Sequence, residues 1–201
     1  VIVARDILLA KETGVKLHLC HCSTADSVKM IALAKEAGLP VTGEVCPHHF
    51  ILTSDDIKED DGNYKMNPPL RSKEDVEALK EGLKNGTMDV ISTDHAPHAK
   101  EEKNRAALTY TELVKTGYLS VMGMAEKMSY NPAKVLGLED KGSVSEGMTA
   151  DLVIFDPNKQ YKIDKSTFAS KGKNTPFDGY EVCGEVAYTL VDGKIVYDCN
   201  K

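Results

Sequence analysis

Several features are scarce or missing in this chain of 201 residues. It has no tryptophan, its aromatic content is 6%, and no apolar run approaches the ~20 residues that a helix needs to span a bilayer. Lysine and arginine form no dense cluster, and the formal net charge of −6 argues against a broad nucleic-acid surface. The composition is that of an ordinary globular protein, and we expect it to bind neither membranes nor nucleic acids.

Cysteine and histidine are distributed unevenly. The chain has five cysteines, and an odd number with Cys20 and Cys22 so close together makes a poor disulfide framework. We therefore expect reduced thiols and a cytoplasmic location. No histidine follows residue 98, so any histidine chemistry is expected in the first half of the chain. The sequence begins at Val1 without an initiator methionine, and we expect the natural start to lie upstream.

Apolar periodicity and breaker residues predict alternating helices and strands. The first part reads as helix 2–11, strand 15–20, a helix capped at 23–24 and ended at 38, strand 41–45, helix 73–84 and strand 88–92. Further helices are expected at 110–115, 121–128 and 131–136, and β-rich segments with a hairpin at 191–194 are expected at 151–155 and 186–197. Connections of this kind suit parallel crossovers, so the predicted fold class is α/β with a small β module after residue 142.

Polar residues gather where each predicted parallel strand ends. His21 follows the first strand, residues 44–49 follow the second, and Asp94, His95 and His98 follow the third. The carboxyl ends of parallel strands converge on one face, where ligands and catalytic groups collect. A capping or hydrogen-bonded core role is nevertheless favoured for four histidines when each is taken alone, namely His18, His48, His49 and His95.

Two kinds of metal site are compatible with these residues. A zinc knuckle would use Cys20, Cys22, Cys46 and a histidine, but structural zinc favours C-x2-4-C spacing. On an extended strand, the C-x-C spacing puts the two cysteines on one face and His21 on the other. A catalytic metal needs only one inward side chain from each strand, and His21 with Asp94 would meet that need.

Four motifs carry a resemblance to a known family, and they occur in the order His18-Leu-Cys-His-Cys-Ser-Thr24, Glu44-Val-Cys-Pro-His-His49, Lys65-Met-Asn-Pro-Pro-Leu-Arg71 and Thr93-Asp-His-Ala-Pro-His98. Together with Lys171-Gly-Lys-Asn-Thr-Pro-Phe177, they resemble the second half of the dihydroorotases of the longer bacterial type. These enzymes are metal-dependent (β/α)8 barrels of the amidohydrolase superfamily. The resemblance implies that residues 1–142 are the C-terminal part of such a TIM barrel and residues 143–201 a small accessory β-sandwich segment.

The resemblance also implies roles for individual residues. His21 corresponds to a zinc ligand, and Asp94 to a zinc ligand that also serves as the catalytic base. Asn67 and His98 correspond to residues that bind the substrate. For Glu44, a structural role and a role beside an extra metal are equally favoured. Arg71 fits neutralisation of an anionic substrate no better than it fits a surface or helix-start role.

The implied activity is the zinc-dependent, reversible hydrolysis of dihydroorotate to N-carbamoyl-aspartate in pyrimidine biosynthesis, with one or two zinc ions. The chain has no His-x-His, however, and lacks the lysine and further histidine that such barrels supply from earlier strands. We therefore expect a missing N-terminal half as a partner, no activity without it, and a homodimer. The stretch 99–108 is also shorter than the loop that this family usually carries there. The alternatives are another cyclic amidohydrolase, such as an allantoinase or hydantoinase, and an inactive scaffold protein.

Overall fold

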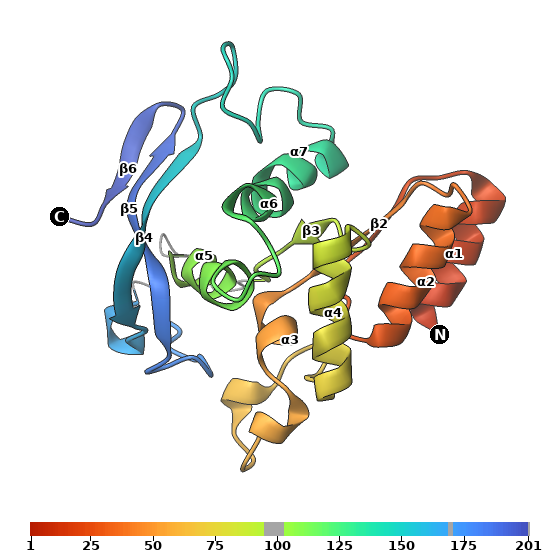
Figure 1. Cartoon of the computed structure of the whole chain (residues 1–201), viewed down its shortest axis with the longest axis horizontal. Helices are drawn as coiled ribbons and strands as arrows, with labels where there is room; N and C mark the ends of the chain where they lie inside the picture. Colours follow the sequence, from red (N-terminus) through yellow and green to blue (C-terminus); the bar gives the residue numbers. More distant parts are fainter. Residues whose placement is uncertain (95–102, 169–170, 201) are drawn as a thin grey trace. The chain divides into compact units, whose positions relative to one another are not determined.

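The computed structural model describes residues 1–94, 103–168 and 171–200 (Figure 1). The chain divides into two units, residues 1–94 and 95–201, and each is described by itself. His95 and His98 lie outside the described residues, as do residues 99–102 of the shortened loop. No helix in the described part of the chain is long and apolar enough to cross a membrane.

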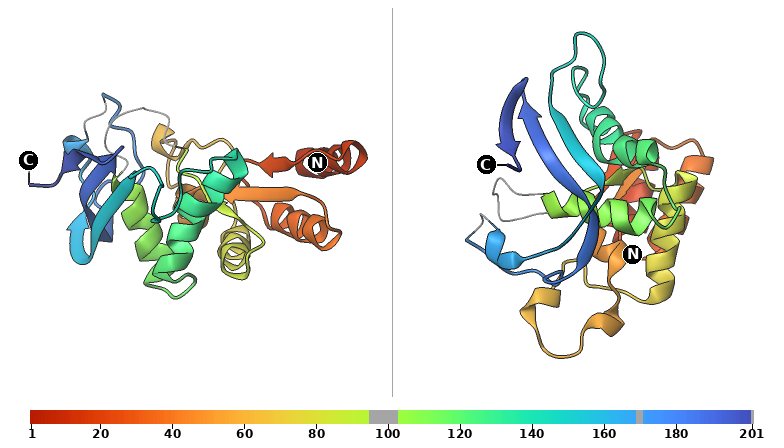
Figure 2. Two further views of the ribbon diagram at one scale, coloured as in Figure 1. Left: turned by 90° about the horizontal axis from the view of Figure 1, so that it is seen from above. Right: turned by 60° about the vertical axis from the view of Figure 1, so that its left-hand side comes forward.

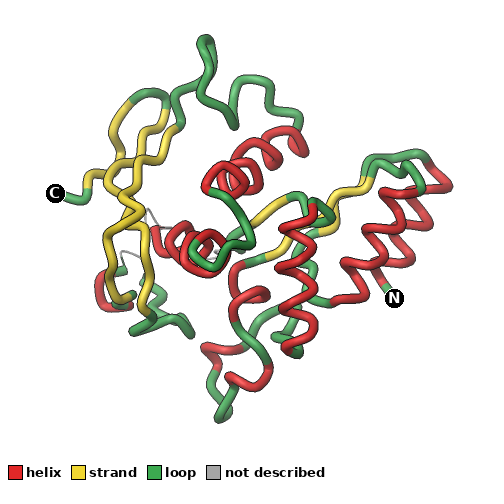
Figure 3. Tube along the Cα trace, viewed as in Figure 1, coloured by secondary structure: helices red, strands yellow, loops and turns green. Residues whose placement is uncertain are grey.

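Helices and strands alternate in the first unit (Figure 3). Its elements are α1 (Ile2–Thr13), β1 (Leu17–Leu19), α2 (Ala25–Glu36), β2 (Val41–Val45), α3 (Pro47–Ile51), the 3-10 turns η1 (Ser54–Asp56) and η2 (Gly62–Tyr64), α4 (Lys73–Asn85) and β3 (Val90–Ile91). The three strands form a parallel sheet in the order β1-β2-β3. The predicted α/β arrangement with parallel strands is therefore confirmed for this unit.

The strands β1 and β3 are shorter than predicted. Strand β1 ends at Leu19 because the backbone of His21 adopts a φ of 53°, which no extended strand allows. The expected alternation across Cys20, His21 and Cys22 is therefore wrong: Cys20 is exposed and Cys22 is buried. Strand β3 covers two residues only, although the amide of Ser92 still donates to the carbonyl of Val45 at 3.1 Å.

Side-chain caps fix where α2 and α4 begin. The hydroxyl of Thr24 accepts from the amide of Ser27, and Ser72 forms a reciprocal capping box with Asp75. The second carboxylate oxygen of Asp75 accepts from the amide of Ala25 at 2.8 Å. Asp75 therefore links the N-terminus of α4 to the N-terminus of α2.

The core of the first unit lies where α2 and α4 pack against β2. A Cβ at Gly43 in β2 would lie 2.7 Å from the Cδ1 atom of Ile31, so the side chain of Ile31 would have to shift to admit a larger residue here. The fully buried side chains of this unit include Ile31, Val45, Cys46, Phe50, Leu79, Leu83 and Met88. The ammonium of Lys35, near the end of α2, pairs with Asp89 at 2.7 Å, and a carboxylate oxygen of Asp89 accepts from the amide of Gly43 in β2 at 2.9 Å.

The second unit combines helices with an antiparallel sheet. Its elements are α5 (Lys103–Thr109), the π-helical turn η3 (Tyr110–Val114), α6 (Val121–Ala125), the π-helical turn η4 (Glu126–Tyr130), α7 (Asn131–Leu136), β4 (Leu152–Lys162), the 3-10 turn η5 (Lys165–Thr167), β5 (Glu181–Val191) and β6 (Lys194–Asp198). Figure 2 shows β4, β5 and β6 as one curved sheet, in that order. The helical segment predicted at 110–115 starts earlier in the structure, at Lys103. The helix predicted at 121–128 is present, and it becomes π-helical from Glu126.

A side-chain bridge holds the helical segment of this unit to its sheet. The hydroxyl of Thr111 accepts from the amide of Cys183 in β5 at 2.9 Å, and the ring of Tyr110 packs edge-on against Phe155 in β4. The predicted hairpin at 191–194 is present, with Asp192 and Gly193 both at positive φ. The described part of residues 143–201 holds one three-stranded sheet, and the second sheet of a sandwich remains a prediction.

Candidate metal centre

The two predicted metal ligands meet at the carboxyl edge of the parallel sheet. His21 lies two residues after β1, and Asp94 lies three residues after β3. The Nε2 atom of His21 is 3.8 Å from the Oδ1 atom of Asp94. This separation is too long for a hydrogen bond, but two ligands of a tetrahedral zinc ion with bonds of about 2.1 Å lie about 3.4 Å apart.

Both residues have an unusual backbone. The φ angles of His21 and Asp94 are 53° and 48°, and among the described non-glycine residues only Asp192 of the hairpin shares this left-handed region. Such conformations cost free energy and cluster at functional sites, where the surrounding structure holds them. The hairpin turn explains the backbone of Asp192. His21 and Asp94, in contrast, both lie just beyond the carboxyl ends of parallel strands, at the same edge of the sheet.

Glu44 in β2 sits between two histidines. Its Oε1 atom is 3.0 Å from Nδ1 of His21, and its Oε2 atom is 3.1 Å from Nε2 of His18. Glu44 is only 7% exposed, and burial by itself would raise its pKa. The hydrogen bond from His18 and the positive potential of His21 outweigh that effect, so the pKa of Glu44 lies below its ordinary value.

The charge on Glu44 fixes the orientation of His21. The same Oε1 atom accepts a hydrogen bond from the backbone amide of His21 at 3.3 Å, so Glu44 contacts both the ring and the backbone of this residue. The other ring nitrogen, Nε2, faces Asp94. A histidine held in this way by a carboxylate is the usual arrangement of a metal-ligating imidazole.

Sequence reasoning gave Cys46 a place only in the disfavoured zinc knuckle. In the structure, its sulfur lies 3.3 Å from Nδ1 of His21, and one ligand atom each from His21, Cys46 and Asp94 lie within 4.8 Å of one another. A second such group joins His18 and Cys20 to Glu44, and a third joins Cys46 to His48 and His49. The cysteines of the knuckle are thus divided between different groups, and Cys22 is in none of the three.

Burial separates Cys22 from this chemistry. Burial, followed by the nearby charge of Glu44, raises the pKa of the Cys22 thiol to about 12. Its thiol is therefore protonated at neutral pH and donates weakly to the carbonyl of Leu19. None of the five cysteines is in a disulfide.

Of the two residues predicted to bind substrate, Asn67 lies in the described part of the chain and His98 does not. Asn67 is exposed in the connection between β2 and α4, directly before Pro68, whose carbonyl accepts from Nε2 of His49 at 2.8 Å. Arg71 at the end of that connection donates to the hydroxyl of Ser23 at 3.2 Å. His98 lies among the residues that the structure does not describe. The hydrogen bonds of Pro68 and Arg71 therefore fix this connection beside the site.

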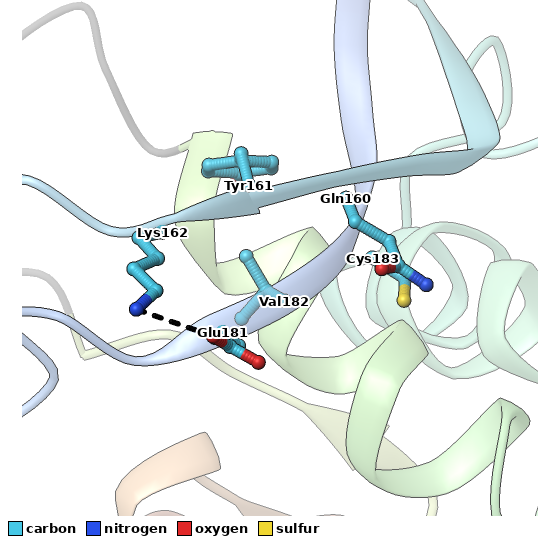
Figure 4. A pocket seen from close by; sticks show the side chains of 6 residues that line it. All are labelled: Gln160, Tyr161, Lys162, Glu181, Val182 and Cys183. Atoms are coloured by element: carbon cyan, nitrogen blue, oxygen red, sulfur yellow. Dashed lines mark ion pairs between the residues drawn. The ribbon is translucent and has the colours of Figure 1, made fainter.

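A hollow in the second unit has a different character. It lies between the paired ends of β4 and β5 and is lined by Gln160, Tyr161, Lys162, Glu181, Val182 and Cys183 (Figure 4). Its ion pair between Lys162 and Glu181, at 3.2 Å, is exposed on both sides. This lining contains no histidine and one carboxylate, so it does not rival the strand-end cluster as a metal centre.

Comparison with known proteins agrees with this geometry. Residues 1–196 match the amidohydrolase family, and the chain belongs to that family. Proteins named dihydroorotase from Ligilactobacillus salivarius and from Caldanaerobacter subterraneus subsp. tengcongensis are 48% and 45% identical to it, over 97% and 100% of this chain. The chain spans 49% and 50% of their lengths, which is about half of each relative.

Solved structures give the same picture for the backbone. A dihydropyrimidinase from Brevibacillus agri superposes with a TM-score of 0.91 at 30% identity, and an L-hydantoinase from Arthrobacter aurescens with 0.88 at 34%. Each match covers 98% of this chain and 48% of the other.

Proposed function

We propose that this chain is part of a dihydroorotase, an enzyme that reversibly hydrolyses dihydroorotate to N-carbamoyl-aspartate in pyrimidine biosynthesis. The observation that carries the proposal is the pairing of His21 with Asp94 across the sheet edge, in a sequence that is 48% identical to proteins named dihydroorotase. Because the chain spans half of those relatives, the remaining metal ligands would come from the rest of the protein.

Zinc is the metal that we propose for this centre, as one ion or two. His21 and Asp94 would hold it, because an imidazole and a carboxylate are ligands that zinc accepts and their facing atoms are suitably spaced. A zinc ion bound there would lower the pKa of a water molecule and polarise the amide carbonyl of the substrate.

Asp94 would move the proton that the reaction requires. Its carboxylate takes a proton from the attacking water while the water oxygen forms a bond to the ring carbonyl carbon. The carbon–nitrogen bond then breaks, and Asp94 gives the same proton to the departing ring nitrogen. Asp94 is 38% exposed in its side chain, so substrate can reach it. Glu44 would contribute by orienting the ring of His21, whose Nδ1 atom lies 3.0 Å from its carboxylate.

Substrate binding is assigned to the connection before α4 and to the segment after Asp94. We propose that Asn67 and His98 bind the pyrimidine ring and its carboxylate, as the family resemblance implies. The anchor of the connection is the contact between Pro68 and His49. Burial is the main cause that lowers the pKa of His49, and the charge of Arg71 acts in the same direction, so Arg71 would add positive potential on the same side.

The family resemblance also implies how the complete protein is organised. The parallel strands β1, β2 and β3 would be the last three of a (β/α)8 barrel, completed by an N-terminal half, and β4 to β6 would be half of an accessory β-sandwich. The boundary between the two stays at 142/143 in this proposal. We also predict that the complete protein is located in the cytoplasm and forms a homodimer.

A hydantoinase is the second candidate, because the solved structures that match include a dihydropyrimidinase and several hydantoinases. Those matches are 26–34% identical, against 45–49% for the proteins named dihydroorotase. Specificity among cyclic amides depends on the substrate loops more than on the shared backbone. The higher identity therefore favours dihydroorotate as the substrate.

The deciding experiment is a turnover assay of the complete protein on dihydroorotate, hydantoin and allantoin. We expect dihydroorotate to be the best substrate by kcat/KM, and metal removal by a chelator to abolish its turnover. A preference for hydantoin or allantoin would replace the proposed activity with that of the second class. No turnover of any of them by the zinc-loaded protein would indicate an inactive scaffold.

A further inference from the structure

A buried sulfur and two buried imidazoles gather directly after β2. Cys46, His48 and His49 are 0%, 4% and 2% exposed, and one ligand atom from each lies within 4.8 Å of the others. The rings of His48 and His49 lie 4.2 Å apart between centroids, at an angle of 61°. Adjacent residues of a helix usually point in different directions, so the approach of these groups depends on the turn at Pro47, where the chain leaves β2 and enters α3.

The hydrogen bonding of His49 leaves one ring nitrogen available. A carbonyl oxygen can only accept, so the contact of 2.8 Å with Pro68 requires the proton of His49 to be on Nε2. The lone pair is therefore on Nδ1, and within the described residues this atom has no hydrogen-bond partner. A buried polar atom without a partner costs about 1–3 kcal/mol, and a bound ion is one of the ordinary explanations.

We propose that Cys46, His48 and Nδ1 of His49 form a second metal site, selective for zinc or another borderline-soft divalent ion. Thiolate and imidazole suit Zn²⁺, whereas Ca²⁺ and Mg²⁺ require oxygen ligands. Three protein ligands leave one position of a tetrahedral zinc ion for water or another group. On binding, the sulfur–metal bond replaces the S–H bond of Cys46, and the proton is released to solvent.

Cys46 also touches the first centre, so the two sites must be distinguished. Its sulfur lies 3.3 Å from His21, and it belongs to the His21–Asp94 group as well as to the buried one. The same thiolate would therefore ligate either the proposed catalytic ion or the buried ion. What separates the two cases is the second ligand: His49 belongs only to the buried group, and Asp94 only to the catalytic one.

Cobalt is a suitable probe because a thiolate ligand gives Co²⁺ an intense near-ultraviolet charge-transfer band that imidazole and carboxylate do not. The metal-free complete protein is titrated with Co²⁺, and zinc content is measured in parallel by mass spectrometry. We expect the band in the wild type and in D94N, and its loss in C46S and H49Q. The amide of glutamine in H49Q can still donate to the carbonyl of Pro68, so this variant removes the lone pair rather than the anchor.

The exposed Cys20 provides the matched control. It lies in the same unit and belongs to the separate group with His18 and Glu44, so C20S is expected to keep the band. Zinc content should fall by one ion per chain in C46S and H49Q relative to C20S. A wild-type protein without the band would overturn the proposal even if no variant folds. Loss of the band in C20S, or loss in D94N with retention in H49Q, would assign the thiolate elsewhere and overturn it as well. A scaffold protein without turnover would leave all these readouts measurable, so the proposed enzyme activity is tested independently.

Discussion

The two sheets of this chain place their charged groups in different ways. At the end of the parallel sheet, the side chain of Glu44 is 10% exposed and contacts two imidazoles, whereas in the antiparallel sheet Lys162 and Glu181 pair with side chains that are 69% and 77% exposed. Parallel strands direct all their carboxyl ends to one edge, and antiparallel strands alternate them. The parallel unit therefore concentrates polar groups in one buried cluster, and the antiparallel unit distributes them over its surface.

The largest expected effect tests this contrast at two aspartates with the same backbone. D94N in the complete protein should lower kcat by roughly a hundredfold to ten-thousandfold, because an amide cannot take the proton from the attacking water. D192N is the matched control, since Asp192 has a φ of 50° against 48° for Asp94 but lies in the β5–β6 hairpin. Asparagine tolerates this backbone, so both variants should fold. Near-normal turnover of D94N would remove Asp94 from the proposed mechanism.

The second contrast concerns apolar side chains. Leu79 in α4 is fully buried, and L79A should lower the free energy of unfolding by about 2–5 kcal/mol through the cavity that it leaves. Val153 in β4 is 57% exposed in this chain, and V153A should change the free energy of unfolding by no more than about 0.5 kcal/mol if Val153 lies on the face of the sheet that the proposed sandwich leaves in solvent. Urea denaturation of the complete protein measures both. An equal loss in V153A would mean that another part of the protein covers β4, as a sandwich requires.

Much of this organisation was predictable from the sequence, because its causes are local. The helices α1, α2 and α4 follow from apolar periodicity and from caps such as Ser72, and β2 has the predicted bounds. The positive φ of His21 was not predictable, since no glycine or other turn signal marks the end of the strand predicted at 15–20. The contacts of Glu44 depend on the register in which His18 pairs with Thr42, and register between parallel strands is a tertiary property.

The cluster of Cys46, His48 and His49 was hidden for the opposite reason. These residues are close in sequence, but a spacing of one or two residues predicts neither a shared helix face nor a shared strand face for all three. The turn that opens α3 at Pro47 brings them together, and the carbonyl of Pro68, from a distant part of the chain, selects the ring nitrogen of His49.

A moderate effect is expected at the carboxylate that orients His21. E44Q should weaken zinc binding to the complete protein by about 10–100-fold, because a neutral amide orients the ring of His21 less strongly than the carboxylate that lies 3.0 Å from it. E185Q is the control, since Glu185 pairs with Lys159 at 2.6 Å in the other sheet. Competition with a chelator gives both affinities. If E44Q binds zinc as tightly as E185Q, Glu44 has only a structural role.

The smallest effect is expected at Asp151, a carboxylate of the antiparallel unit. The hydrogen bond from Lys141, reinforced by the amide of Asp192 at 2.8 Å, holds the pKa of Asp151 below its ordinary 3.8. Because the pKa of Asp151 is lower in the folded state, its ionised carboxylate stabilises the folded protein at pH values above the ordinary pKa. This contribution is lost as the pH falls through the lower, folded-state pKa. A carboxyl NMR titration should show the depression in the wild type and a return towards 3.8 in K141Q. Added salt should act in the same direction as K141Q, because exposed pairs are screened. A titration insensitive to both changes would mean that this pair is shielded from solvent, and the contrast between the two units would not hold there.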